Sequence, residues 1–168
     1  MSSSRSSCES PVKRVDYYRI DLKQIPRKYR CSEKLPVTRA SPLKLRKEVE
    51  RFAIYFQREF EYPVQEFTAK EKRPYTAYLL SESKRRVWIG ACCFRPQSGV
   101  SALDRETLRW IWLHPYYRMK GVLTDAWPKL RADHGDFLVE PPFSPAMRHF
   151  LLKHNSSSEF YSFYRNVG

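Results

Sequence analysis

The sequence contains no uninterrupted apolar run of about 18 residues, the length that a membrane-spanning helix requires. Its serine-rich start also lacks the apolar core of a secretory signal. No internal repeat occurs, so a solenoid or fibrous architecture is excluded. We therefore expect a cytoplasmic protein without a membrane partner.

Cysteine is also scarce, with four residues, and none of them has the paired spacing of a metal site. Cys92 and Cys93 are adjacent in an apolar stretch, so in a strand they would point to opposite faces. This pattern favours reduced thiols over disulfides, and it predicts no metal site.

Acidic residues are few: 18 Asp or Glu face 31 Lys or Arg, which gives a net charge of +13. Most of the excess lies in residues 1–47, which hold 13 basic against 4 acidic residues. Such a balance favours a polyanionic partner, and the tyrosines of this region, Tyr17, Tyr18 and Tyr29, are suited to stacking on bases. A solvated basic flank whose tyrosines pack on the domain is the alternative.

The chain contains enough apolar residues to form a core, since 42% of its residues are hydrophobic and 15% are aromatic. We expect one domain over residues 43–168, preceded by a basic, partly mobile extension over residues 1–42. Ser41 and Pro42 predict a helix start, as a cap followed by a first-turn proline. The apolar residues that follow at helical spacing are Leu45, Val49, Phe52, Phe56 and Phe60.

Three strands are predicted next, over residues 75–80, 87–94 and 107–113, the first two as a hairpin. Pro115 ends the third strand, and helical spacing resumes after Gly121. The free amides of this helix's first turn, with the helix dipole and the cations of Arg118 and Lys120, are suited to a pyrophosphate. Gly121 would let a ligand approach the backbone closely.

The C-terminal part continues this alternation of helices and strands. Gly135 is expected to close the helix, residues 136–140 form a short strand, and Ser144 with Pro145 begins a last helix that ends near His154. His114, which precedes the turn, is interpreted as a structural residue because a lone histidine at a strand end is usually hydrogen-bonded.

Arg118, Gly121 and Leu123 stand where the cofactor motif of the GCN5-related N-acetyltransferases (GNAT) has Arg or Gln, Gly, and Gly or Ala. The sequence resembles that family, and it departs from the motif at Leu123, which is bulkier. Residues 107–154 also look like the catalytic end of the sister-chromatid cohesion acetyltransferases. The resemblance implies an α/β fold with a central twisted mixed β-sheet flanked by helices on both faces.

The same resemblance implies acetyl-CoA as cofactor and assigns its contacts. The exposed backbone of the third strand would bind the pantetheine arm, and the loop after it would bind the pyrophosphate. The residues carried over are Ile111, Trp112 and Leu113 for the arm, and Arg118, Met119, Lys120, Gly121, Val122 and Leu123 for the pyrophosphate.

Candidates for the acid and base chemistry lie further along the chain. Glu140 ends the strand beside the cofactor and is the first candidate for general base, with an exposed strand-end carboxylate as the alternative. Ser144 is the second candidate, since it is placed like the serine of the cohesion enzymes, although helix capping alone would explain it. Tyr161 and Tyr164 are candidate donors to the leaving sulfur, as a tyrosine often is in this fold.

The function predicted from these residues is acetyl-CoA-dependent N-acetyl transfer to an amine by direct attack in a ternary complex. The alternative is a nucleic-acid-binding protein that uses the fold as a scaffold and the basic N-terminal region as its footprint. A protein lysine and an RNA-linked amine both stay open as acceptors, and the sequence does not fix the oligomeric state.

Overall fold

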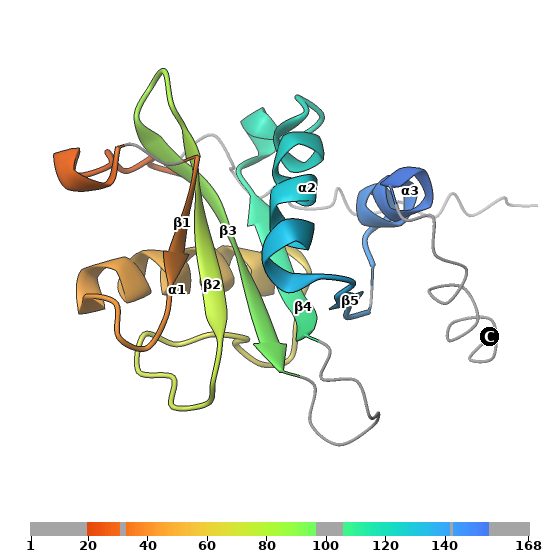
Figure 1. Cartoon of the computed structure of the whole chain (residues 1–168), viewed down its shortest axis with the longest axis horizontal. Coiled ribbons are helices and arrows are strands. Elements are labelled where there is room, and N and C mark those ends of the chain that lie inside the picture. Colours follow the sequence, from red (N-terminus) through yellow and green to blue (C-terminus); the bar gives the residue numbers. More distant parts are fainter. Residues whose placement is uncertain (1–19, 31–32, 97–105, 142, 155–168) are drawn as a thin grey trace, which may run out of the picture.

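The computed structural model describes residues 20–30, 33–96, 106–141 and 143–154 (Figure 1). One five-stranded mixed sheet has the order β1-β2-β3-β4-β5, antiparallel from β1 to β4 and parallel between β4 and β5. The strands are β1 (Lys34–Val37), β2 (Thr76–Glu82), β3 (Val87–Pro96), β4 (Glu106–Leu113) and β5 (Leu138–Val139). The helices are α1 (Leu43–Glu59), α2 (Val122–His134) and α3 (Pro145–His154), with short 3-10 turns η2 (Arg27–Tyr29) and η3 (Pro115–Tyr117).

The helices form where their spacing predicted them. In α1, Leu45, Val49 and Phe52 are buried on one face. The expected Ser41 cap is wrong: Pro42 occupies the cap position, and the Ser41 hydroxyl accepts a hydrogen bond from the Thr38 amide at 3.0 Å. None of the helices in the described part of the chain is long and apolar enough to cross a membrane.

Two cores lie on the two faces of the sheet, as Figure 1 shows with α1 behind the strands and α2 in front. The first core joins α1 to the sheet through residues such as Phe52 and Trp112. The second joins α2 to the sheet through residues such as Trp127 and Leu108. Cys93 belongs to the first core and Cys92 to the second, which confirms that these thiols point to opposite faces. Helices on both faces of a mixed sheet are the predicted fold class.

The sheet begins ahead of residue 43, where the domain was expected to start. Strand β1 pairs with β2, Val37 is fully buried, and Gln24 forms an isolated bridge to Val87. Pro36 fits β1 because β1 is an edge strand, where a missing amide donor costs no pairing. The proposed extension over residues 1–42 therefore supplies part of the sheet from its described residues.

Strands β4 and β5 pair over only two positions and then separate. The ladder ends at Leu108, which faces Val139 and whose carbonyl accepts from the Glu140 amide at 3.0 Å. On the other side of β4, Cys93 faces Trp110 while Phe94 faces Leu108. Arg109 has no residue opposite it on β3, so β4 bulges there, next to the point where β5 separates from it. This opening of the sheet positions the candidate site.

Candidate active site

A groove of about 260 Å³ runs along β4 beyond this opening, between the η3–α2 loop and α3. We call it the cofactor groove. Eight of the nine predicted cofactor residues line it: Ile111, Trp112, Leu113, Arg118, Met119, Gly121, Val122 and Leu123. The remaining lining residues are Phe60, Tyr117, Thr124, Ser144, Ala146, Met147 and Phe150. The fold therefore brings the predicted set together at one surface.

The N-terminus of α2 forms one end of the cofactor groove. Gly121 has φ +81°, a conformation that favours glycine, and only the Asp125 carboxylate lies within 4 Å of where its Cβ would stand. The first hydrogen bond of α2 runs from the Asp125 amide to the Gly121 carbonyl at 2.9 Å. The amides of Val122, Leu123 and Thr124 precede it, as the free donors of a helix start do. This end of the groove is suited to an anion.

A second polar group in the groove also lacks a partner. The Tyr117 hydroxyl is buried and forms no hydrogen bond within the described residues. Leu123, where the family motif has a small residue, packs its side chain against the α2 core while lining the groove.

The side chain of Arg118, which was expected to assist phosphate binding, is engaged by a carboxylate. Its Nη1 and Nη2 donate to Glu59 Oε1 and Oε2 at 2.6 and 2.7 Å, and its Nε donates to the Leu113 carbonyl at 2.8 Å. Trp112 Nε1 donates to the same Glu59 carboxylate at 2.7 Å. Arg118 therefore fixes the loop to the end of α1, because a two-pronged ion pair outcompetes a flexible contact.

Lys120 also departs from its expected place. Its ammonium lies 3.3 Å from the centre of the Tyr116 ring, and the residue is not part of the groove lining. A cation over an aromatic face is held by the ring's electrons. Of the two side chains expected to assist phosphate binding at this loop, Arg118 is paired with Glu59 and Lys120 lies over the Tyr116 ring.

Replacing Glu59 with Gln is expected to lower the free energy of unfolding by about 1–3 kcal/mol. The amide has one acceptor oxygen and no charge, so it cannot accept from both the Arg118 guanidinium and the Trp112 indole as the carboxylate does. Glu59 is 11% exposed at its side chain and Arg118 is 34% exposed, so solvent screens the pair only in part. Urea denaturation measures the change. Glu61→Gln, an exposed neighbour, is the matched control, and equal stability of the two variants would contradict the anchoring role.

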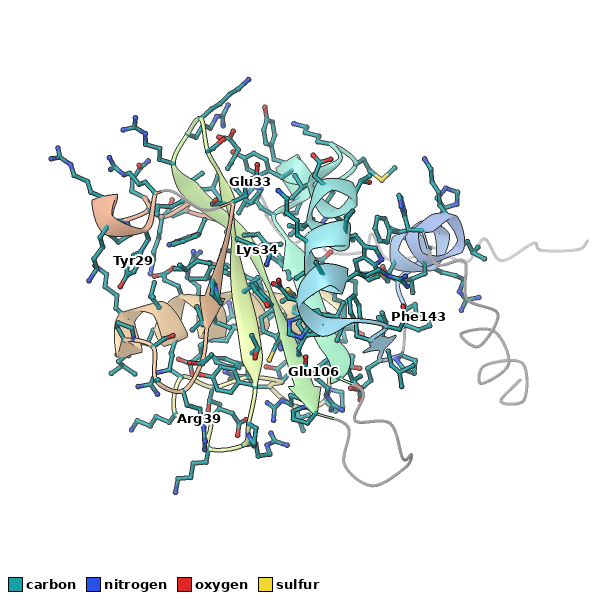
Figure 2. All side chains as sticks on the ribbon, viewed as in Figure 1. Tyr29, Glu33, Lys34, Arg39, Glu106 and Phe143 are labelled. Carbon is teal, nitrogen blue, oxygen red and sulfur yellow. The ribbon has the colours of Figure 1, made fainter. Side chains whose placement is uncertain are left out.

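A second cavity of about 160 Å³ lies at the vertex where β4 and β5 part. We call it the vertex pocket. It shares Phe60, Ile111, Ser144 and Met147 with the cofactor groove, so the two cavities adjoin. Its other lining residues are Phe56, Tyr62, Leu108, Arg109, Trp110, Val139, Glu140 and Phe143. Phe143, labelled in Figure 2, lies between β5 and α3 on this wall.

The charges of the vertex pocket centre on Arg109, the bulge residue of β4. Its guanidinium pairs with Glu140, and its Nη2 lies 3.5 Å from Glu66 Oε2. Burial is the main cause that raises the pKa of Glu140 above the usual carboxyl range, while Arg109 acts to lower it and Glu66 to raise it. Burial and these carboxylates also raise the pKa of Tyr62, whose hydroxyl donates to the Pro141 carbonyl at 3.2 Å.

Ser144 caps α3, since its hydroxyl accepts a hydrogen bond from the Met147 amide at 3.1 Å. Ser144 also lines both cavities, so it caps the helix and lies at the candidate site as well. Tyr161 and Tyr164 lie outside the described residues. His114 is buried, its Nδ1 accepts from the Tyr116 amide at 3.2 Å, and burial lowers its pKa, which agrees with a structural role.

Sequence patterns did not point to four residues of this site: Glu59, Tyr62, Arg109 and Tyr117. Glu59 had one usable signal, because an acid in the last turn of a helix opposes the helix dipole and needs a compensating partner. Arg109 had another, as a charged residue in the middle of a strand that is otherwise free of charge from Thr107 to Leu113. Their partners are far away in sequence, and spacing alone does not identify them.

No family model matches the sequence, and no curated protein matches it either. Solved acetyltransferases do match its structure. A ribosomal-protein-alanine N-acetyltransferase from Brucella melitensis biovar Abortus 2308 matches with a TM-score of 0.53 at 14% identity, over 76% of this chain and 94% of that one. An acetyltransferase from Trypanosoma brucei matches with a TM-score of 0.45 at 12% identity, over 74% and 93%. The first match, with the strand order and the parallel β4–β5 pair, shows that the chain has a GNAT-like fold.

Proposed function

We propose that this protein is an acetyl-CoA-dependent N-acetyltransferase that brings acetyl-CoA and an amine together in one ternary complex. The observation that carries this proposal is that two cavities adjoin at the β4–β5 opening and share four lining residues. One ends at the free amides of α2 and the other at the Glu140 carboxylate. The likeness to solved N-acetyltransferases supports the fold on which the proposal depends.

Acetyl-CoA supplies a thioester whose carbonyl carbon accepts the amine nitrogen: a C–N bond forms, the C–S bond breaks, and the thiolate leaves. The chain's own part is to position and to move protons. The free edge of β4 at Ile111, Trp112 and Leu113 would hold the pantetheine arm, and the α2 amides would hold the pyrophosphate. These contacts fix the thioester near the vertex pocket.

Glu140 is the proposed general base: it accepts a proton from the acceptor's ammonium group, so that the neutral amine can attack the thioester carbonyl. Its raised pKa brings the carboxylate closer to the pKa of the group that it must deprotonate. Tyr164 stays the proposed donor to the leaving thiolate. Ser144, already the cap of α3 and part of the pocket lining, is the second candidate for this base.

One observation favours nucleic-acid binding as a second candidate function. The exposed Tyr116 ring has two cations near it, with the Lys120 ammonium 3.3 Å and the Arg85 guanidinium 5.5 Å from its centre. An exposed aromatic ring beside two cations is suited to a base and its phosphates. Salt-dependent RNA binding that Tyr116→Ala weakens would support this function, and the two functions are compatible in one protein.

Calorimetric titration of acetyl-CoA into the purified protein tests the main proposal, with desulfo-CoA and dephospho-CoA in parallel. We expect micromolar binding, and release of free thiol when an amine is added. Absence of acetyl-CoA binding at millimolar concentration would overturn the proposal. An RNA oligonucleotide titrated separately at moderate salt shows whether the second function holds.

A further inference from the structure

We infer that a cavity between η2 and the start of α1 binds single-stranded nucleic acid, on one surface with the exposed Tyr116 ring. This rests on the second candidate function, because it adds a binding site to it. Three observations carry it: unpaired cations at the cavity, a basic turn that leads from the cavity to Tyr116, and an aromatic ring beside a cation at both ends.

The cavity has a volume of about 330 Å³ and shares no lining residue with the cofactor groove or the vertex pocket. We call it the lysine pocket. Tyr29, labelled in Figure 2, lies on its wall between η2 and α1. Sites for organic ligands begin at about 300 Å³, so the lysine pocket has room for part of a nucleotide. Its lining residues are Lys23, Gln24, Pro26, Lys28, Tyr29, Pro42, Lys44, Leu45, Glu48 and Trp88.

The lysine pocket holds more cations than its own carboxylate neutralises. Glu48 is its one acidic lining residue, and it accepts from Lys23 Nζ at 2.8 Å and from Arg51 Nε at 3.0 Å. Lys28 and Lys44 are exposed, and neither forms an ion pair with any residue that the structure describes. Two unpaired ammonium groups at one cavity attract the phosphates of a polyanion.

The turn between β2 and β3 joins the lysine pocket to the Tyr116 ring. The Ile25 amide donates to the Arg86 carbonyl at 2.8 Å, which holds the segment before η2 against this turn. On the other side of the turn, the Arg85 guanidinium lies 5.5 Å from the centre of the Tyr116 ring. In Figure 1 the turn accordingly lies between η2 and the η3–α2 loop. The two contacts therefore belong to one surface.

This turn is itself basic, since Lys84, Arg85 and Arg86 are all exposed. The nearby Glu82 carboxylate accepts from the turn's own backbone amides, at 3.1 Å from Lys84 and 2.5 Å from Arg85. Cations that follow one another along a surface match a row of phosphates better than they match a single anion. The ligand that fits them is an extended polyanion.

An aromatic ring lies beside a cation at both ends of this surface. The Lys28 ammonium is 4.9 Å from the centre of the Tyr29 ring, and the Lys120 ammonium is 3.3 Å from that of Tyr116. Unpaired bases stack on such rings, whereas the bases of a duplex are covered by their neighbours. An acidic peptide would use the cations and leave the rings without a partner. The combination favours a single strand.

The test measures how salt weakens the binding of a labelled single-stranded RNA of about 16 nucleotides, by fluorescence anisotropy. Replacing both Lys28 and Lys44 with Gln removes two phosphate contacts. We expect the slope of log K against log salt to become shallower by about 1.4, at about 0.7 for each contact. Lys70→Gln with Lys72→Gln removes the same charge from exposed residues of the loop between α1 and β2, and this matched control should leave the slope unchanged.

Equal slopes in the two double variants would overturn the inference. So would tighter binding of polyglutamate, or of a duplex with the same number of phosphates, than of the single strand. Thermal melting shows that both variants fold. If Tyr116→Ala weakens RNA binding and the Lys28 and Lys44 replacements do not, nucleic-acid binding stands and the lysine pocket fails; if no strand binds, both fail. The acetyl-CoA titration decides the main proposal separately.

Discussion

Replacing Gly121 with Glu is expected to weaken acetyl-CoA binding by 100-fold or more, about 2.7 kcal/mol. The substitution places a carboxylate at the N-terminus of α2, where it would satisfy the free amides and repel the pyrophosphate. It also puts a side chain on a residue with φ +81°, which adds strain at the loop. Calorimetric titration of acetyl-CoA into the variant and the unmodified protein measures the loss.

Gly121→Asn separates the charge from the strain. Asparagine tolerates the left-handed conformation better than most residues, and space for its Cβ is available because the nearest atom is Asp125 Oδ2 at 3.9 Å. We expect less than a tenfold loss of affinity. If the Glu and Asn variants lose affinity equally, the effect lies in the backbone, and the amides of α2 do not hold the phosphates.

Replacing Glu140 with Gln is expected to reduce kcat/KM by about 100-fold to 10,000-fold, the range that removal of a general base produces. Folding should survive, since the amide keeps the size of the side chain. The unmodified protein should lose activity as the pH falls through the Glu140 pKa, because the carboxylate is the active form. Burial raises this pKa, so the loss begins above the pH at which an ordinary carboxyl is protonated.

The pH profile distinguishes a base from a merely structural carboxylate. Glu66 contributes to the raised pKa of Glu140, so Glu66→Gln should move the acidic limb to lower pH while the plateau rate changes little. The same amine is used throughout, since its own deprotonation adds a second limb at high pH. An unchanged limb in Glu140→Gln would show that another group titrates, and Glu140 would no longer be the base.

The elements with strong local patterns were predictable from the sequence. Apolar residues at helical spacing identified α1 through Leu45, Val49 and Phe52. Pro115 after the strand and Gly121 before the helix located the turn between β4 and α2. These patterns are local, because a few neighbouring residues fix the period or block it. The residues of the cofactor groove followed from the same stretch, since most of them are consecutive in the chain.

Features that depend on distant partners were not predictable. Strand β1 has four residues and a proline, and it becomes a strand only because β2 supplies its pairing. The bulge at Arg109 is a matter of register between β3 and β4. The ion pair between Arg118 and Glu59 joins residues 59 positions apart, so the spacing of the loop residues did not indicate it. Long-range pairing decides each of these cases.

The back-to-back cysteines of β3 make the two faces of the sheet separately observable. Cys92 and Cys93 are both fully buried, and burial raises the pKa of Cys93 to about 12 and that of Cys92 well above its usual range. Neither thiol should react with an alkylating reagent until its own face opens. With Cys8 and Cys31 changed to Ser, mass spectrometry of the labelled peptides would time the exposure of each face independently. The two adjacent cysteines would thus report which of the two cores is exposed first during unfolding.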